Sequence, residues 1–164
     1  WPGCMQKSWR EMWKMNESLP PDCGGCFQAD GGNFLALADF VIDKHPDMGL
    51  AAISALHDEV IRLFFTPGEN NCATLTTADP FEITTGQLFG GSLFPASKYE
   101  AGLLGVRAKY ADTGRLSSYV FGAPKDLVHQ HIFRARFYES VVGGKTIAQF
   151  VKEFLDGTVQ QVGP

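Results

Sequence analysis

The chain has 164 residues, of which 45% are hydrophobic and 20% are charged. This composition excludes a disordered, collagen-like or low-complexity chain, and the length predicts one compact domain over residues 1–164. A formal net charge of −4 supplies no basic field for nucleic acid or an anionic membrane, and no apolar run approaches the ~20 residues of a transmembrane helix.

The first predicted helix begins at a capping box, Ser8–Glu11, and ends before the two prolines at 20–21. Three large apolar residues fall on one face of this helix: Trp9, Met12 and Trp13. Tryptophan is enriched at binding hot spots. Trp9 and Trp13 are therefore predicted to form a partner surface, and closure of the core is their alternative role.

The four cysteines are predicted to form two disulfides. They are Cys4, Cys23, Cys26 and Cys72. Residues 19–33 are rich in Pro, Gly, Asp and Asn, so we expect an irregular loop there, with Cys23 and Cys26 each pairing outside it. The CxxC spacing leaves a redox dithiol and a zinc site as alternatives.

The expected location follows from the same residues. The chain opens with Trp rather than Met, which indicates a processed or trimmed chain. The even cysteine count and the sequon at Asn16 favour export, because disulfides persist outside the cytosol. We therefore expect a secreted or lumenal glycoprotein with Asn16 as the glycosylation site.

Two further helices are predicted before residue 66. The first runs from the N-cap Asn33 to about Lys44, and His45-Pro46 ends it. The second is expected over residues 47–65. Its inner face would carry Leu50, Ile53, Val60, Ile61 and Phe64, and its outer face Asp58, Glu59 and Arg62.

The middle of the chain is the least regular part. Residues 66–98 show no steady period, and a short strand is predicted only at residues 81–84. Apolar and polar residues then alternate over 104–110, which is the period of a half-buried strand. A turn at 112–114 precedes a second strand at 116–121, so a β-hairpin is predicted.

The C-terminal part completes the predicted fold. Alternation over residues 131–137 favours a third antiparallel strand, and a capping box at Thr146–Gln149 opens a helix that Gly157 ends. The sequence therefore predicts an α+β fold with N-terminal helices, a small antiparallel sheet and a C-terminal helix. An all-α fold is the alternative.

Histidine spacing gives the clearest chemical signal. His129 and His131 lie two residues apart, so on a strand both imidazoles point to one face, as two ligands of a single metal ion must. His57 is a further potential ligand within the predicted helix 47–65. Histidines that only form hydrogen bonds are the alternative at all three positions. The residues identify no cofactor.

Together these features favour a small extracytoplasmic, disulfide-stabilised binding or accessory domain. Such a domain would act through an apolar ligand pocket or by docking onto a larger assembly, so its expected partner is a protein or a small apolar ligand. The alternative is a metal-dependent hydratase or hydrolase in which His129 and His131 hold zinc and a carboxylate such as Glu59 orients the attacking water.

Overall fold

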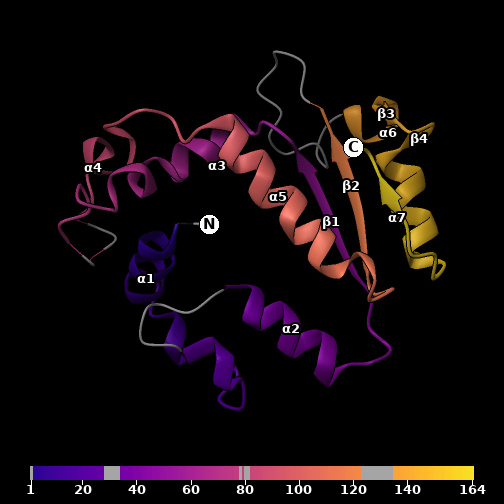
Figure 1. Cartoon of the computed structure of the whole chain (residues 1–164), viewed down its shortest axis with the longest axis horizontal. Coiled ribbons are helices and arrows are strands. Elements are labelled where there is room, and N and C mark those ends of the chain that lie inside the picture. Colours follow the sequence, from indigo (N-terminus) through magenta and orange to yellow (C-terminus); the bar gives the residue numbers. More distant parts are fainter. Residues whose placement is uncertain (1, 28–33, 78, 80–81, 123–134) are drawn as a thin grey trace. The chain divides into compact units, whose positions relative to one another are not determined.

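The computed structural model describes residues 2–27, 34–77, 79, 82–122 and 135–164. The chain, drawn in Figure 1, forms two compact units. The N-terminal unit comprises residues 1–46 and 61–95, and the C-terminal unit comprises residues 47–60 and 96–164. Within the described residues, every helix is too short or too polar to cross a membrane.

Short helices make up most of the first part of the chain. They are α1 (Gly3–Met12), η1 (Met15–Glu17), η2 (Gly24–Phe27), α2 (Phe34–Lys44), α3 (Glu59–Phe64), η3 (Thr66–Asn70) and α4 (Thr85–Phe89), where η denotes a 3-10 helix. The helix predicted to end near Lys44 is confirmed by α2. It ends before Pro46 because the residue preceding a proline disfavours the helical conformation.

A disulfide and an aromatic cluster connect α1 to the η3 region of the N-terminal unit. Cys4 of α1 is bonded to Cys72, 68 residues later in the chain. The Trp9 ring stacks on Phe65 with 5.5 Å between ring centroids, and Phe65 meets Phe94 edge-on at 5.8 Å. These contacts fix the position of α1 within its unit.

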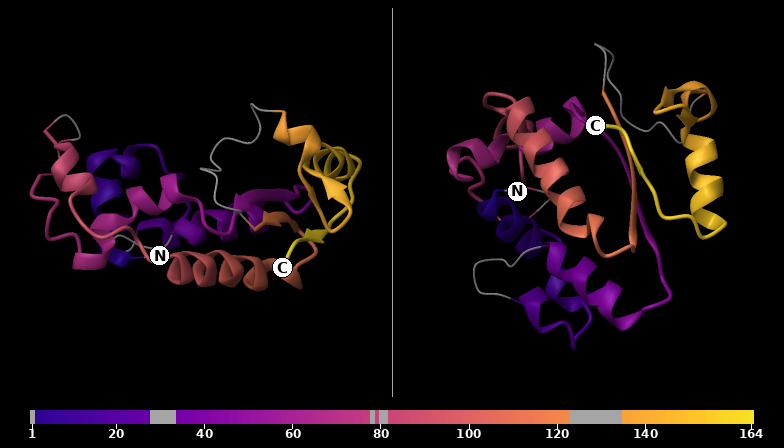
Figure 2. Two further views of the ribbon diagram at one scale, coloured as in Figure 1. Left: turned by 90° about the horizontal axis from the view of Figure 1, so that it is seen from above. Right: turned by 45° about the vertical axis from the view of Figure 1, so that its right-hand side comes forward.

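The C-terminal unit is built on a parallel sheet of order β1-β2-β5, seen in two further views in Figure 2. Its elements are β1 (Leu50–Ala55), α5 (Ala96–Ala111), β2 (Leu116–Phe121), α6 (Arg136–Glu139), β3 (Val141–Val142), β4 (Lys145–Thr146), α7 (Ile147–Leu155) and β5 (Gln161–Val162). Parallel strands cannot be joined by a tight turn, so a crossover connection is required. The helix α5 forms part of the crossover that leads into β2.

The helices α5 and α7 lie on opposite faces of this sheet (Figures 1 and 2). On the α5 face, the hydroxyls of Ser54 and Tyr99 are 3.3 Å apart. On the α7 face, Tyr119 packs edge-on against Phe150 with 5.5 Å between ring centroids. This second face carries the buried core cluster of the unit: Ala55, Tyr119, Phe121, Ile147, Phe150 and Val162.

A small hairpin joins the sheet to α7. Strands β3 and β4 pair antiparallel, and the two residues between them, Gly143 and Gly144, both have positive φ angles of 55° and 80°. A two-residue turn of this kind favours glycine. The Tyr119 hydroxyl lies 3.1 Å from the backbone carbonyl of Ser140 and 2.8 Å from that of Lys145, and the two carbonyls share its one proton, which ties the hairpin to β2.

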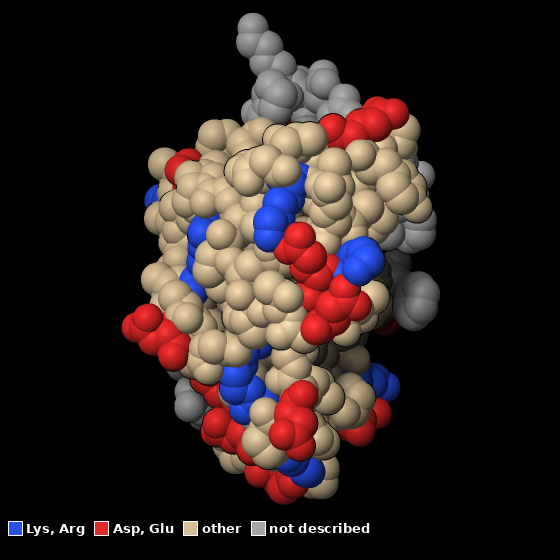
Figure 3. Space-filling view, turned by 90° about the vertical axis from the view of Figure 1, so that its right-hand side faces the viewer, with Lys and Arg blue, Asp and Glu red and all other residues tan. Residues whose placement is uncertain are grey.

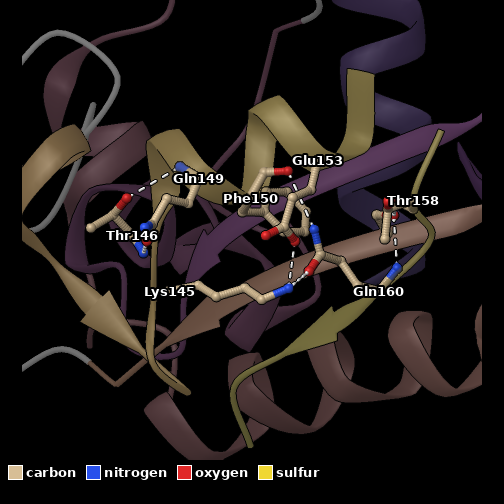
Figure 4. Close-up of polar contacts among 8 residues, drawn as sticks. Lys145, Thr146, Gln149, Phe150, Glu153, Thr158 and Gln160 are labelled. Carbon is tan, nitrogen blue, oxygen red and sulfur yellow. Dashed lines mark hydrogen bonds and ion pairs between the residues drawn. The ribbon is translucent and has the colours of Figure 1, made fainter. Parts of the chain in front are cut away.

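Polar contacts at the start of α7 are shown in Figure 4. The predicted capping box is confirmed: Thr146 accepts from the backbone N–H of Gln149, and the Gln149 side chain accepts from the backbone N–H of Thr146. The Lys145 ammonium donates to Glu153 and, at 2.5 Å, to the Gln160 side chain. The hydrogen bond from Lys145 lowers the pKa of the Glu153 carboxyl below its ordinary value.

The structure corrects the predicted sheet. A mixed helix–strand fold is confirmed, and residues 116–121 form β2 as predicted, but the main sheet is parallel rather than antiparallel. Residues 104–110, predicted as a strand, belong to α5. The short alternation there is overridden because a parallel pair needs a crossover segment between its strands. Of the third predicted strand, residues 131–134 lie outside the described residues, and α6 begins at residue 136.

The helix predicted over residues 47–65 is also wrong. This stretch contains β1, a turn and then the short helix α3. A short apolar run has no period that separates a buried strand from a buried helix, and pairing with β2 decides it here. Asp58, expected on an outer helical face, is instead 8% exposed.

Two smaller predictions also fail. The first helix begins at Gly3, directly after Pro2, so Ser8 lies inside α1 rather than at its N-cap. Pro2 is the N-cap of α1, and a proline is tolerated there because the N–H groups at a helix start have no partner within the helix. Within the predicted strand at 81–84, residue 81 lies outside the described residues, and 82–84 form no strand and lead into α4.

Candidate functional site

An apolar pocket lies in the N-terminal unit. Its volume is about 410 Å³, and its walls come from α1, α3, α4 and the turn before α4. The lining residues are Trp9, Met12, Trp13, Ile61, Phe64, Ile83 and Leu88. This volume is within the range of small-molecule sites, near its lower end.

Helical spacing explains the wall formed by α1. Trp9, Met12 and Trp13 are three and four residues apart, so they share one face of the helix. Met12 is buried, whereas Trp13 is 66% exposed. The structure thus brings both tryptophans of the predicted partner surface, Trp9 and Trp13, to the same pocket.

The opposite wall depends on short-range polar contacts. Thr84 and Gln87 form a capping box that starts α4 and thereby fixes the turn of helix that carries Leu88. Phe64 of α3 packs edge-on against Phe89 of α4 with 5.7 Å between ring centroids. The pocket walls are therefore stabilised by two aromatic contacts: Phe64 with Phe89, and Trp9 with Phe65.

Every lining side chain is apolar or aromatic, which restricts the chemistry of the pocket. Such a site can bind an uncharged apolar group by removing its surface from water. It offers no carboxylate or imidazole for acid–base catalysis among its lining residues. The chemistry that these lining residues offer is therefore apolar contact with whatever enters the pocket.

Part of this site was missed by sequence reasoning. Ile61 and Phe64 were predicted to face a core, but Ile83 and Leu88 fall in the stretch where no helix was expected. The signal that predicts α4 is its capping box: threonine at 84 and glutamine three residues later.

The cysteine pairing is simpler than predicted. Cys23 and Cys26 bond to each other, with their Cα atoms 5.3 Å apart, and Cys4 pairs with Cys72. The expectation that Cys23 and Cys26 pair outside their loop is wrong, because the turn η2 brings the two Cα atoms within disulfide range. The backbone carbonyl of Cys26 accepts a hydrogen bond from the buried Arg10 guanidinium.

Arg10 also defines the surroundings of the predicted glycosylation site. Its guanidinium donates to the Asn16 side-chain oxygen at 3.1 Å. Asn16 is otherwise exposed, at the 3-10 turn η1. Glycosylation of Asn16 stays a prediction.

The histidines form no metal centre in the part of the chain that is described. His57 Nε2 lies 3.0 Å from the carboxylate of Glu100 in α5. His129 and His131 lie outside the described residues. Among residues that are described, no three His, Cys, Asp or Glu side chains are grouped for metal binding. The zinc hypothesis stays a prediction.

Charged groups on the surface are mixed in sign. On the face drawn in Figure 3, acidic and basic side chains lie beside one another. Two ion pairs involve α7: Lys152 with Asp156 at 2.6 Å, and Lys145 with Glu153. The charged side chains of α7 are thus neutralised locally.

Comparison with known proteins adds no relative: the chain matches no protein-family model, no curated protein and no solved structure.

Proposed function

We propose that this chain is a small extracytoplasmic, disulfide-stabilised binding domain that takes a compact, uncharged apolar ligand between α1, α3 and α4. The pocket of about 410 Å³ is the observation that carries this proposal. Its walls are apolar, so binding would be driven by burial of ligand surface and would select against charge, because an unpaired charge is costly to desolvate.

The aromatic residues support a preformed site. Trp9 is stacked on Phe65, and Phe64 is packed on Phe89, so both side chains are held in place without a ligand. A site that needs little ordering loses less of its binding energy to conformational entropy. Trp13, which is mostly exposed, supplies the side chain that a ligand would cover.

The two disulfides support the extracytoplasmic part of the proposal. Both bonds persist most readily in an oxidising compartment. The bond at Cys4 lies one to two turns from Trp9 on the same helix, so it also stabilises the wall that carries both tryptophans.

Two fluorescent probes with one skeleton test the proposal. N-phenyl-1-naphthylamine is uncharged, and 8-anilinonaphthalene-1-sulfonate adds a sulfonate to the same rings. At about −0.3 kcal/mol per non-hydrogen atom, a probe of about 17 such atoms binds with a Kd of roughly 0.2 mM. We expect the uncharged probe to bind with quenching of tryptophan fluorescence, and the sulfonate to bind at least about tenfold more weakly.

Neighbouring positions on α3 provide the matched variants. Phe64→Ala removes a pocket wall and should weaken binding of the uncharged probe, whereas Leu63→Ala removes a similarly exposed side chain that does not line the pocket. Leu63→Ala should leave the affinity unchanged. Equal weakening by both variants, or tighter binding of the sulfonate, would contradict the proposal.

A further inference from the structure

The two edges of the parallel sheet differ in protection. At one edge, β5 is two residues long, and the Arg107 side chain donates to the carbonyls of Gly163 and Pro164 directly after it. Short strands with occupied backbone groups resist pairing with other chains. The β5 edge is therefore poorly suited to pairing with a strand of another chain.

The other edge of the described sheet is β1, and its sequence has none of the residues that usually protect an edge strand. The strand has the sequence Leu-Ala-Ala-Ile-Ser-Ala, without charge, proline or glycine. All six residues pair with β2 in continuous register, so no bulge interrupts it. Among the described strands, β2 is the only partner of β1.

Backbone hydrogen bonds show which groups point outward. The N–H groups of Leu50 and Leu56 both donate to carbonyls of the β2 side, at 2.8 Å and 2.9 Å. Because backbone groups alternate between the two edges of a strand, the even-numbered residues face β2. Ala51, Ile53 and Ala55 therefore direct their N–H groups away from it.

The three residues whose N–H groups point away from β2 have a symmetric sequence. They read Ala–Ile–Ala in either chain direction and are uncharged. If two copies of β1 paired antiparallel about a two-fold axis at Ile53, Ile53 would lie opposite Ile53 of the second copy. Ala51 of each copy would lie opposite Ala55 of the other. A two-fold contact must be self-complementary in this way, and side chains directly opposite one another on antiparallel strands are close enough to interact.

We propose that β1 is a homodimerisation edge, at which a second copy of this chain adds its own β1 antiparallel and continues the sheet. In this arrangement the outward N–H and C=O groups of Ile53 are exchanged with those of the second copy. The outward groups of Ala51 meet those of Ala55 of the second copy, whose carbonyl also accepts from the Ser54 hydroxyl at 3.3 Å within each strand.

Sedimentation equilibrium across about 5 to 500 µM tests the proposal, a range that covers weak dimers. Ala51→Pro removes an outward N–H group and places the ring on the open edge, while the ladder to β2 is kept. Ala51→Thr is the matched control, because it keeps the N–H group and suits a strand. We expect the wild type and Ala51→Thr to dimerise, and the dimer Kd of Ala51→Pro to rise at least about tenfold.

Amide hydrogen exchange gives a second readout that does not require the proline variant to fold. In the wild type, protection of the 51 and 53 amides should increase with protein concentration, whereas protection of the 52 and 54 amides should not. A monomer across the whole range, or a dimer that Ala51→Pro leaves intact, would overturn the proposal. So would protection of the outward amides in the monomer, since another segment would then occupy the edge.

Discussion

The two disulfides should contribute unequally to stability, because they close loops of very different length. Cys4 and Cys72 are 68 residues apart, whereas Cys23 and Cys26 are three apart. The loss of chain entropy in the unfolded state grows with the logarithm of loop length, which gives about 4.4 kcal/mol for the long loop and no more than about 1.9 kcal/mol for the short one. We therefore expect a difference of about 2.5 kcal/mol.

The test compares two double variants, Cys4→Ala with Cys72→Ala and Cys23→Ala with Cys26→Ala. Each double variant removes two sulfur atoms, so the two lose a similar amount of packing. The difference between their free energies of unfolding therefore measures the difference between the two crosslinks. Urea unfolding measures the free energy, and its denaturant slope should rise only when the long loop is opened, because the unfolded state then exposes more surface.

Equal losses in the two double variants would refute the loop-length reasoning, as would a larger loss without the Cys23–Cys26 bond. An unchanged denaturant slope in the Cys4 and Cys72 variant would show that the long crosslink does not restrict the unfolded state. The entropic account would then have to be replaced by one based on contacts in the folded protein.

Three further predictions concern the C-terminal unit. Tyr119→Phe should cost about 1–3 kcal/mol in urea unfolding, because the carbonyls of Ser140 and Lys145 lose the hydroxyl proton that they share, whereas Tyr138→Phe at an exposed position should be silent. Phe150→Ala should cost about 3–5 kcal/mol, and Leu155→Ala on the same helix, at 75% exposure, should stay within about 0.5 kcal/mol. Burial raises the pKa of Tyr99 and Tyr119. Above about pH 10 the unfolded state therefore releases these phenol protons while the folded state keeps them. The thermal unfolding midpoint should fall as the pH rises past that value, and it should fall less steeply in Tyr119→Phe.

Local signals by themselves determined several elements. The capping box at Thr146 fixed the start of α7, and His45-Pro46 fixed the end of α2. Residues 116–121 formed the predicted strand, and the even number of cysteines gave two disulfides. Capping and the restriction before proline act within about four residues, so their effect can be read from the sequence without knowledge of the rest of the fold.

Tertiary structure decided the sheet and the pocket. The run Leu50–Ala55 suits a helix or a strand, and only its pairing with residues 116–121 makes it a strand. That parallel pairing then requires a crossover, which turns the alternating residues 104–110 into part of α5. The pocket likewise joins side chains from α1, α3 and α4, which are distant in sequence. Trp9 and Trp13 could be singled out from their spacing, but Leu88 could not, because the surface it shares with them exists only after the chain has folded.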